Sequence, residues 1–270
     1  MEQETFQAFQ QIAYRKAGIF LRPGKAALVQ ARLAKRLREL GLGSEREYLH
    51  RLQADEGDEL VVFLDSISTN FTKFFREPDH FQTLQEWARA GLAAGQRRFR
   101  FWCAGCSSGE EPYTAAMVLD GVLEGRDWKI LATDISTRVL TRAATAVYGE
   151  EELEPIPASY RSRYLEPAAP DGTGAARQAI CRRLRERIVF RRLNLAVHPY
   201  PMSGPLDAVF CRNVMIYFDR PMRAGLVGEI ERLLHPGAPL FIGHSETLNG
   251  ITTRLRAERP SVYRQPEEAR

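Results

Sequence analysis

Apolar residues in the first 70 positions recur at the spacing of a helix. The clearest stripe is formed by Val29, Leu33, Leu37 and Leu40. Gly41 is a typical helix end, and Ser44 with Glu47 has the spacing of a capping box that opens the next helix. Residues 60–67 continue at helical spacing. We therefore predict an all-helical domain over residues 1–70.

From about residue 97 the pattern changes to short apolar runs that alternate with helical stretches. The runs are RFRFWCA (98–104), WKILATD (128–134), RIVFRRL (187–193), LDAVFCRN (206–213) and APLFIGH (238–244). Strands that alternate with helices are typical of a doubly wound, mostly parallel sheet. The fold class is therefore α/β, with the α/β domain over residues 97–270 and a connecting segment over 71–96.

The segment around the domain boundary mixes small polar side chains with three phenylalanines. Pro78 suits the first turn of a helix over residues 79–90. In one interpretation the segment is a connector whose phenylalanines fill the core. In the other, Asn70, Thr72 and Arg76 line the edge of a pocket between the domains. Position alone favours neither interpretation.

Composition and charge limit the class of protein. The chain has 270 residues, of which 44% are hydrophobic and 27% charged, and this excludes a disordered tail or a collagen-like repeat. Its longest apolar runs are about ten residues, well short of the roughly 18 needed to cross a bilayer. A net charge of +4 is too balanced for general nucleic-acid binding. We expect a soluble protein that is not exported, binds no nucleic acid and does not insert into a membrane.

Neither a metal site nor a catalytic cysteine is predicted. The four cysteines are Cys103, Cys106, Cys181 and Cys211, and they provide no second CxxC that would complete a zinc site. They are also too few for a disulfide scaffold, so a reducing compartment is expected. His244 and Ser245 lack the G-x-S-x-G motif of a serine hydrolase.

A local excess of positive charge lies in the helical domain. Residues 15–51 contain ten Lys or Arg against three acids. Four of these cations project mostly from the side opposite the apolar stripe: Arg32, Lys35, Arg36 and Arg38. They form either the solvated face of a helix packed on the core or a docking surface for an acidic partner.

The first predicted strand of the α/β domain ends in a loop of small residues, which is followed by a helix over residues 113–123. Gly105 in this loop allows the backbone to approach a ligand closely, and the loop lies where doubly wound folds bind ligands. Glu110 and Glu111 lie near the start of the helix, where they would repel a phosphate. A cationic amino group would be attracted instead.

Asp134 ends the second predicted strand. An acid in this place either binds both hydroxyls of a ribose or caps the next helix. A glycine loop without phosphate preference, an acid for an ammonium group and an acid for a ribose together fit S-adenosylmethionine better than NAD.

Five segments resemble the bacterial chemotaxis receptor glutamate O-methyltransferases, the CheR-type enzymes. They are TNFTKFFREPDHF (69–81), CAGCSSGEEPYTAAM (103–117), ATDIS (132–136), LDAVFCRNVMIYFD (206–219) and GHSETL (243–248). The resemblance implies an N-terminal helical domain and a class I (Rossmann-like) methyltransferase domain, with a small antiparallel subdomain inserted at about 155–190. It also implies the conversion of receptor glutamates to γ-methyl esters in the cytoplasm.

The resemblance assigns roles to single residues. Arg76 and Tyr217 correspond to residues at the transferred methyl group and the substrate. The residues implied to line the cofactor site are Asn70, Thr72, Arg76, Glu111, Asp134, Asn194, Leu195, Arg212 and Asn213, to which the loop adds Gly105. The basic helix residues are implied to dock on the cytoplasmic helical bundle of a chemoreceptor. A monomer without a metal is expected, while the receptor, its glutamates and any binding of a receptor pentapeptide stay open.

The chemistry of methyl transfer to a carboxylate agrees with these roles. A glutamate has a pKa of about 4.3, so the acceptor is already ionised and needs no general base. The protein must supply position and desolvation. Arg76 suits a carboxylate clamp and Tyr217 an orienting hydroxyl, although packing is the alternative for Tyr217. Two other functions stay open: a nicotinamide-dependent oxidoreductase and a non-catalytic sensor of S-adenosylmethionine.

Overall fold

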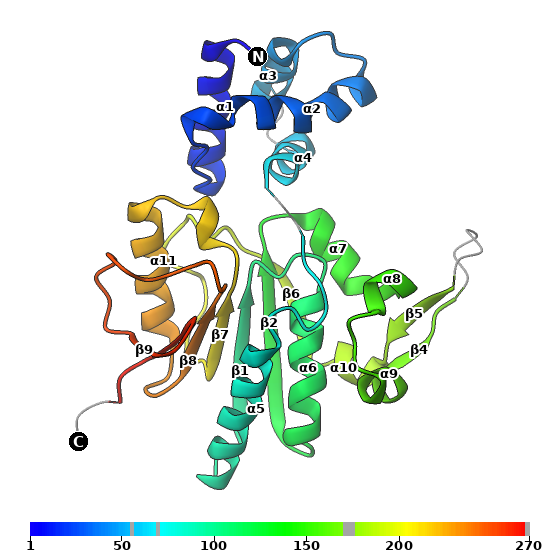
Figure 1. The fold of residues 1–270 in the computed structure, drawn as a ribbon, viewed down its shortest axis with the longest axis vertical. Helices are drawn as coiled ribbons and strands as arrows, with labels where there is room; N and C mark the ends of the chain where they lie inside the picture. Colours follow the sequence, from blue (N-terminus) through cyan, green and yellow to red (C-terminus); the bar gives the residue numbers. More distant parts are fainter. Residues whose placement is uncertain (55–56, 69–70, 170–175, 268–270) are drawn as a thin grey trace.

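A computed structural model describes residues 1–54, 57–68, 71–169 and 176–267 (Figure 1). The helical domain stands at one end of the molecule, above the α/β domain. It consists of α1 (Gln3–Ala17), the short 3₁₀ helix η1 (Pro23–Lys25), α2 (Ala26–Leu40), α3 (Glu45–Ala54) and α4 (Asp58–Ile67).

The apolar stripe of α2 packs into the core of this domain, as predicted. Val29 and Leu33 are buried, and Gly41 ends the helix in the left-handed conformation with φ of 66°. At the start of α3 the amide of Glu47 donates to the Ser44 hydroxyl at 3.3 Å. The Glu47 carboxylate accepts from the Gly43 amide, so only one half of the predicted capping box forms.

The α/β domain contains a seven-stranded sheet in the order β6-β2-β1-β7-β8-β10-β9. Its strands are β1 (Arg98–Ala104), β2 (Asp127–Asp134), β6 (Ile188–Arg192), β7 (Ala208–Cys211), β8 (Pro239–Ile242), β9 (Arg256–Arg259) and β10 (Val262–Arg264). Strands β6, β2, β1, β7 and β8 are parallel, and β10 is antiparallel to both of its neighbours. All five predicted strand runs are confirmed, whereas the hairpin of β9 and β10 was not predicted.

Helices cover both faces of the sheet, so it is doubly wound. They are α5 (Pro78–Ala93), α6 (Glu110–Val122), α7 (Thr137–Thr145) and α11 (Arg220–Leu233). Phe99 and Phe101 of β1 belong to the same buried cluster as residues of α5 and α6. Trp102, between Cys103 and Phe101, points to the opposite face and belongs to the cluster that contains residues of α11.

A separate three-stranded antiparallel sheet is inserted between α7 and β6. It has the order β3-β5-β4, with β3 at Val147–Gly149, β4 at Leu165–Pro167 and β5 at Arg177–Ile180. Short helices accompany it: α8 (Glu150–Leu153), α9 (Ala158–Tyr164) and α10 (Arg182–Arg185). The first of its strands precedes residue 155, and the sequence DGTGA (171–175) lies outside the described residues. Within the described ranges no helix is long and apolar enough to cross a membrane.

Candidate functional site

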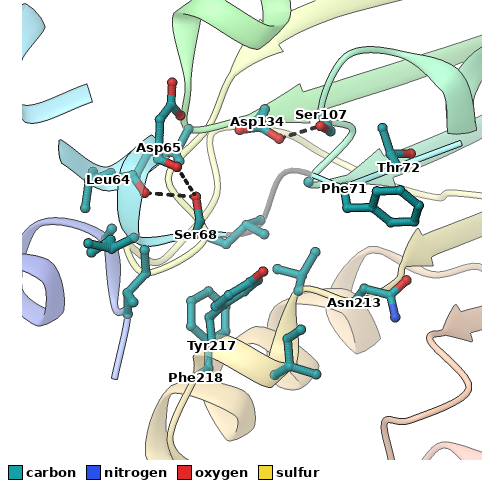
Figure 2. A pocket seen from close by; sticks show the side chains of 18 of the residues that line it. Leu64, Asp65, Ser68, Phe71, Thr72, Ser107, Asp134, Asn213, Tyr217 and Phe218 are labelled. Carbon is teal, nitrogen blue, oxygen red and sulfur yellow. Dashed lines mark hydrogen bonds between the residues drawn. The ribbon is translucent and has the colours of Figure 1, made fainter. Parts of the chain in front are cut away.

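A cavity of about 620 Å³ lies between the helical domain and the carboxyl ends of the parallel strands (Figure 2). Gly105 follows β1, Asp134 ends β2 and Arg212 follows β7, and all three residues line the cavity. The volume is within the range of about 300–1,000 Å³ that small-molecule sites occupy. The strand ends around β1 are also where ligands bind in doubly wound folds.

Glu111, in the first turn of α6, carries a buried carboxylate oxygen that accepts no hydrogen bond from the described residues. Its Oε2 atom accepts a hydrogen bond from Nη1 of Arg212 at 3.3 Å, while Oε1 is buried and has no hydrogen-bond partner in the described part of the chain. Burial raises the pKa of Glu111, and the charge of Arg212 opposes this rise. A buried acceptor that lines a cavity is expected to meet a donor from a ligand. An ammonium group fits this need.

Arg212 is buried and binds three groups beside the cavity. Its guanidinium donates to Glu77 at 3.0 and 3.2 Å, to Glu111 and to the carbonyl oxygen of Arg76. Each of its three side-chain nitrogens therefore has an acceptor within the protein. Glu77 was missed by the sequence analysis, although it stands directly between Arg76 and Pro78.

Asp134 faces the cavity from the end of β2. Its Oδ2 atom accepts from the amide of Ser107 at 2.9 Å, as Figure 2 shows, and Oδ1 accepts from the amide of Ser136 at 3.0 Å. The cap of α7 is Ser136, whose hydroxyl accepts from the amide of Val139 at 3.3 Å. The alternative that Asp134 is itself the helix cap is therefore wrong. Burial raises the pKa of Asp134.

Gly105 is needed where the loop turns against its neighbours. It has φ of 76°, and a Cβ atom there would lie 2.5 Å from Cγ2 of Val214. The amides of Gly105 and Cys106 both donate to the carbonyl of Thr133, at 2.8 and 2.9 Å. These contacts keep the loop close to the end of β2.

The connecting segment divides its side chains between the core and the cavity, so both interpretations of it apply. Phe74 is fully buried and packs edge-on against Tyr148, with 4.9 Å between the two ring centres. Thr72 and Arg76 line the cavity. Nη1 of Arg76 donates to the carbonyl of Phe71 at 2.9 Å. Asn70 lies outside the described residues.

Asn194, Leu195, Asn213 and Tyr217 also line the cavity. The Asn194 side chain donates to the carbonyl of Lys16 at 2.7 Å and so ties the end of α1 to the α/β domain. The amide of Asn213 donates to Glu246 at 2.8 Å, a contact that was not predicted. Tyr217 ends the 3₁₀ helix η2 (Met215–Tyr217), and Figure 2 shows its hydroxyl directed toward the interior of the cavity.

The basic residues of α2 do not form one solvated face. Lys35 and Arg38 are exposed, but Arg36 pairs with the buried Glu59 at 2.6 Å, and Arg32 donates to the carbonyl of Ile67 at 2.8 Å. Tyr48 donates a further hydrogen bond to Glu59 at 2.8 Å. The difference arises because α4 places a carboxylate in the core, and a buried charge requires a partner.

One group near the cavity could hold a metal ion by its composition. Ligand atoms of Glu77, His80 and His244 lie within 4.8 Å of one another, and both ring nitrogens of His80 are buried without a hydrogen-bond partner in the described residues. Burial lowers the pKa of His80 to about 4, so it is neutral. The guanidinium of Arg212, 3.0 Å from Glu77, opposes a second cation at that carboxylate.

Comparison with known proteins agrees with the order of the two domains. Residues 4–68 match the family model "CheR methyltransferase, all-alpha domain", and residues 70–263 match "CheR methyltransferase, SAM binding domain". The chain is 40% identical to "Chemotaxis protein methyltransferase 2" of Pseudomonas aeruginosa, a match that covers 96% of this chain and 92% of that protein. It is 38% identical to "Chemotaxis protein methyltransferase" of Escherichia coli, with 96% and 89% covered.

Proposed function

The chain belongs to the CheR methyltransferase family, and from this premise we propose that it methylates glutamate γ-carboxylates in the cytoplasmic helical bundle of chemoreceptors. The methyl donor of the family is S-adenosyl-L-methionine. The observation that carries the proposal is the buried carboxylate oxygen of Glu111, which has no hydrogen-bond partner among the described residues and faces a cavity also lined by Asp134, Arg76 and Tyr217.

Two acids would hold the donor in this cavity. Glu111 would accept from its amino group, because Oε1 is buried and no residue that the structure describes donates to it. Asp134 would accept from the ribose hydroxyls, because its carboxylate lines the cavity and a carboxylate oxygen can accept more than one hydrogen bond. Asn194 and Leu195 lie on the same cavity and are proposed to contact the adenine.

Two further residues would act on the acceptor. The bound donor supplies an electrophilic methyl group on a positively charged sulfur. Arg76 is half-buried at the cavity and would pair with the acceptor carboxylate, keeping it anionic as water leaves. Tyr217 would orient that carboxylate through its hydroxyl. Because the acceptor is already ionised at neutral pH, the protein's contribution is position rather than proton removal.

The two other functions have less support. The acidic first turn of α6 would repel the phosphates of a nicotinamide dinucleotide. A sensor that binds S-adenosylmethionine without turnover has no use for a carboxylate clamp beside the donor site. We also propose that the enzyme acts as a cytoplasmic monomer without a metal, and that Lys35 and Arg38 contribute to receptor docking because they are exposed.

The proposal is tested by incubating the protein with a chemoreceptor cytoplasmic fragment and methyl-labelled S-adenosylmethionine. Transfer to glutamate yields methyl esters, which release labelled methanol in base. The matched control is the same fragment with its glutamates replaced by glutamine. Methanol release from the first fragment alone supports the proposal. Binding of S-adenosylhomocysteine without any methanol release would favour the sensor.

A further inference from the structure

Exposed apolar side chains gather at the mouth of the cavity. Within the described residues seven large apolar side chains are exposed, and four of them line this cavity. These four, which we call the apolar rim, are Phe20 (47% exposed), Leu28 (41%), Phe71 (66%) and Ile216 (45%). They come from four different segments, namely the α1–η1 loop, α2, the connecting segment and η2. Exposed apolar side chains that gather around one cavity are typical of a binding site.

Positive charges accompany the apolar rim. Arg22, Lys25 and Lys73 line the same cavity and are exposed, and none of them forms an ion pair in the part of the chain that the structure describes. Asp65 also lines the cavity, but it is buried and pairs with Arg138 at 2.9 Å. The mouth therefore presents an apolar and cationic surface to a partner.

We propose that the apolar rim binds the apolar side chains that flank the acceptor glutamate on one face of an acidic amphipathic helix. This inference rests on the proposed function, because the glutamate must enter the cavity to reach Arg76 and Tyr217. On a helix, residues three and four positions away lie beside that glutamate and would then meet the rim. Acidic residues farther along the same helix would meet the three exposed cations.

Phe71 is the rim residue best placed to contact the acceptor. Its ring is two-thirds exposed, but its carbonyl oxygen accepts from Nη1 of Arg76 at 2.9 Å. The Arg76 guanidinium also lies 5.9 Å from the centre of the Phe71 ring. One contact with the acceptor helix would thus be made directly beside the proposed carboxylate clamp.

A second copy of this chain is a poorer occupant. In a symmetric dimer each rim would face the other, and the exposed cations of one mouth would meet those of its partner. An acidic amphipathic helix would cover the same apolar surface without this repulsion. The methyl donor itself is the remaining candidate for contact with the apolar rim, and the affinity of the rim variants for S-adenosylhomocysteine tests this alternative.

The test compares Phe71→Ala and Leu28→Ala with Val197→Ala, a matched control. Val197 is 60% exposed but does not line the cavity. Titration of an unmethylated chemoreceptor bundle measures binding without any need for catalysis. We expect each rim variant to raise the Kd for the bundle roughly tenfold, the effect typical of truncating a central interface residue. Val197→Ala should stay within about twofold of wild type, and Phe71→Leu should restore most of the affinity.

Affinity for S-adenosylhomocysteine reports on the fold and on the donor site of each variant. It should be unchanged in all four variants. Unchanged bundle affinity in Phe71→Ala and Leu28→Ala would overturn the inference, and so would an equal loss in Val197→Ala. A loss of S-adenosylhomocysteine affinity in the rim variants would assign the rim to the donor instead. None of these outcomes depends on methanol release, which tests the proposed function separately.

Discussion

Replacing Glu111 with glutamine tests whether the cavity binds the amino group of the donor, because Glu111 carries the oxygen atom that we assign to that group. Oε1 of Glu111 is buried and without a partner in the described residues, so the ammonium group of a ligand would form a charge-assisted hydrogen bond there. Such bonds contribute about 1.5–3 kcal/mol. At about 1.4 kcal/mol per tenfold, Glu111→Gln should raise the Kd for S-adenosylhomocysteine roughly 10- to 150-fold.

The neighbouring Glu110 provides the matched control. It is also buried in the first turn of α6, but it bonds to the hydroxyl of Ser108 at 2.8 and 2.9 Å and does not line the cavity. Glu110→Gln should therefore leave the Kd within about threefold of wild type. Calorimetric titration measures both values on the intact protein.

A second ligand separates recognition of the amino group from structural damage. Methylthioadenosine lacks the amino acid part, so wild type and Glu111→Gln should bind it with similar affinity. Equal losses for both ligands, or no loss for S-adenosylhomocysteine, would refute the assignment. Burial raises the pKa of Glu111 above its ordinary 4.5, so wild-type affinity should fall with acidification already above that pH. The variant should lack this dependence.

Three further predictions concern stability and the glycine loop. Glu59→Gln should lower the free energy of unfolding by about 2–3 kcal/mol, measured in urea, because the Arg36 guanidinium loses its buried partner. His80 has a pKa of about 4 in the folded protein against an ordinary 6.5, so the unfolded chain takes up this proton at a higher pH than the folded protein does. The free energy of unfolding should therefore fall as the pH is lowered from 6.5 to 4. His80→Phe should reduce this fall, measured by urea unfolding across that pH range. Gly105→Ala should weaken S-adenosylhomocysteine binding at least tenfold in calorimetry, because Cβ would lie 2.5 Å from Val214 at a positive φ.

The strands of the parallel sheet could be predicted because burial on both faces makes each of them a short apolar run. β7 and β8 are buried at every position. Strand β9 could not be predicted in this way, because all four of its residues are exposed at the edge of the sheet. Its pairing with β10 depends on the tertiary structure alone.

Glu111 and Asp134 could be predicted to line the cavity because a helix start and a strand end fix their positions locally. Asp65, which also lines the cavity, could not be predicted, and neither could Glu77 and Glu246, since their partners come from distant segments. Glu77 meets Arg212, and Glu246 accepts from the amides of Gly243, Asn213 and Ile216. The same holds for Arg36, because a stripe on α2 does not reveal which residue on its other face α4 will cover.

A crystal structure of the protein with S-adenosylhomocysteine bound tests most directly whether this cavity is the donor site. We expect one ligand per chain in the cavity between the domains. Its amino group should bond to Oε1 of Glu111, its ribose hydroxyls to Asp134, and its sulfur should face Tyr217 and Arg76. A ligand bound elsewhere, or one in the cavity with its amino group away from Glu111, would show that Glu111 and Asp134 do not form the donor site.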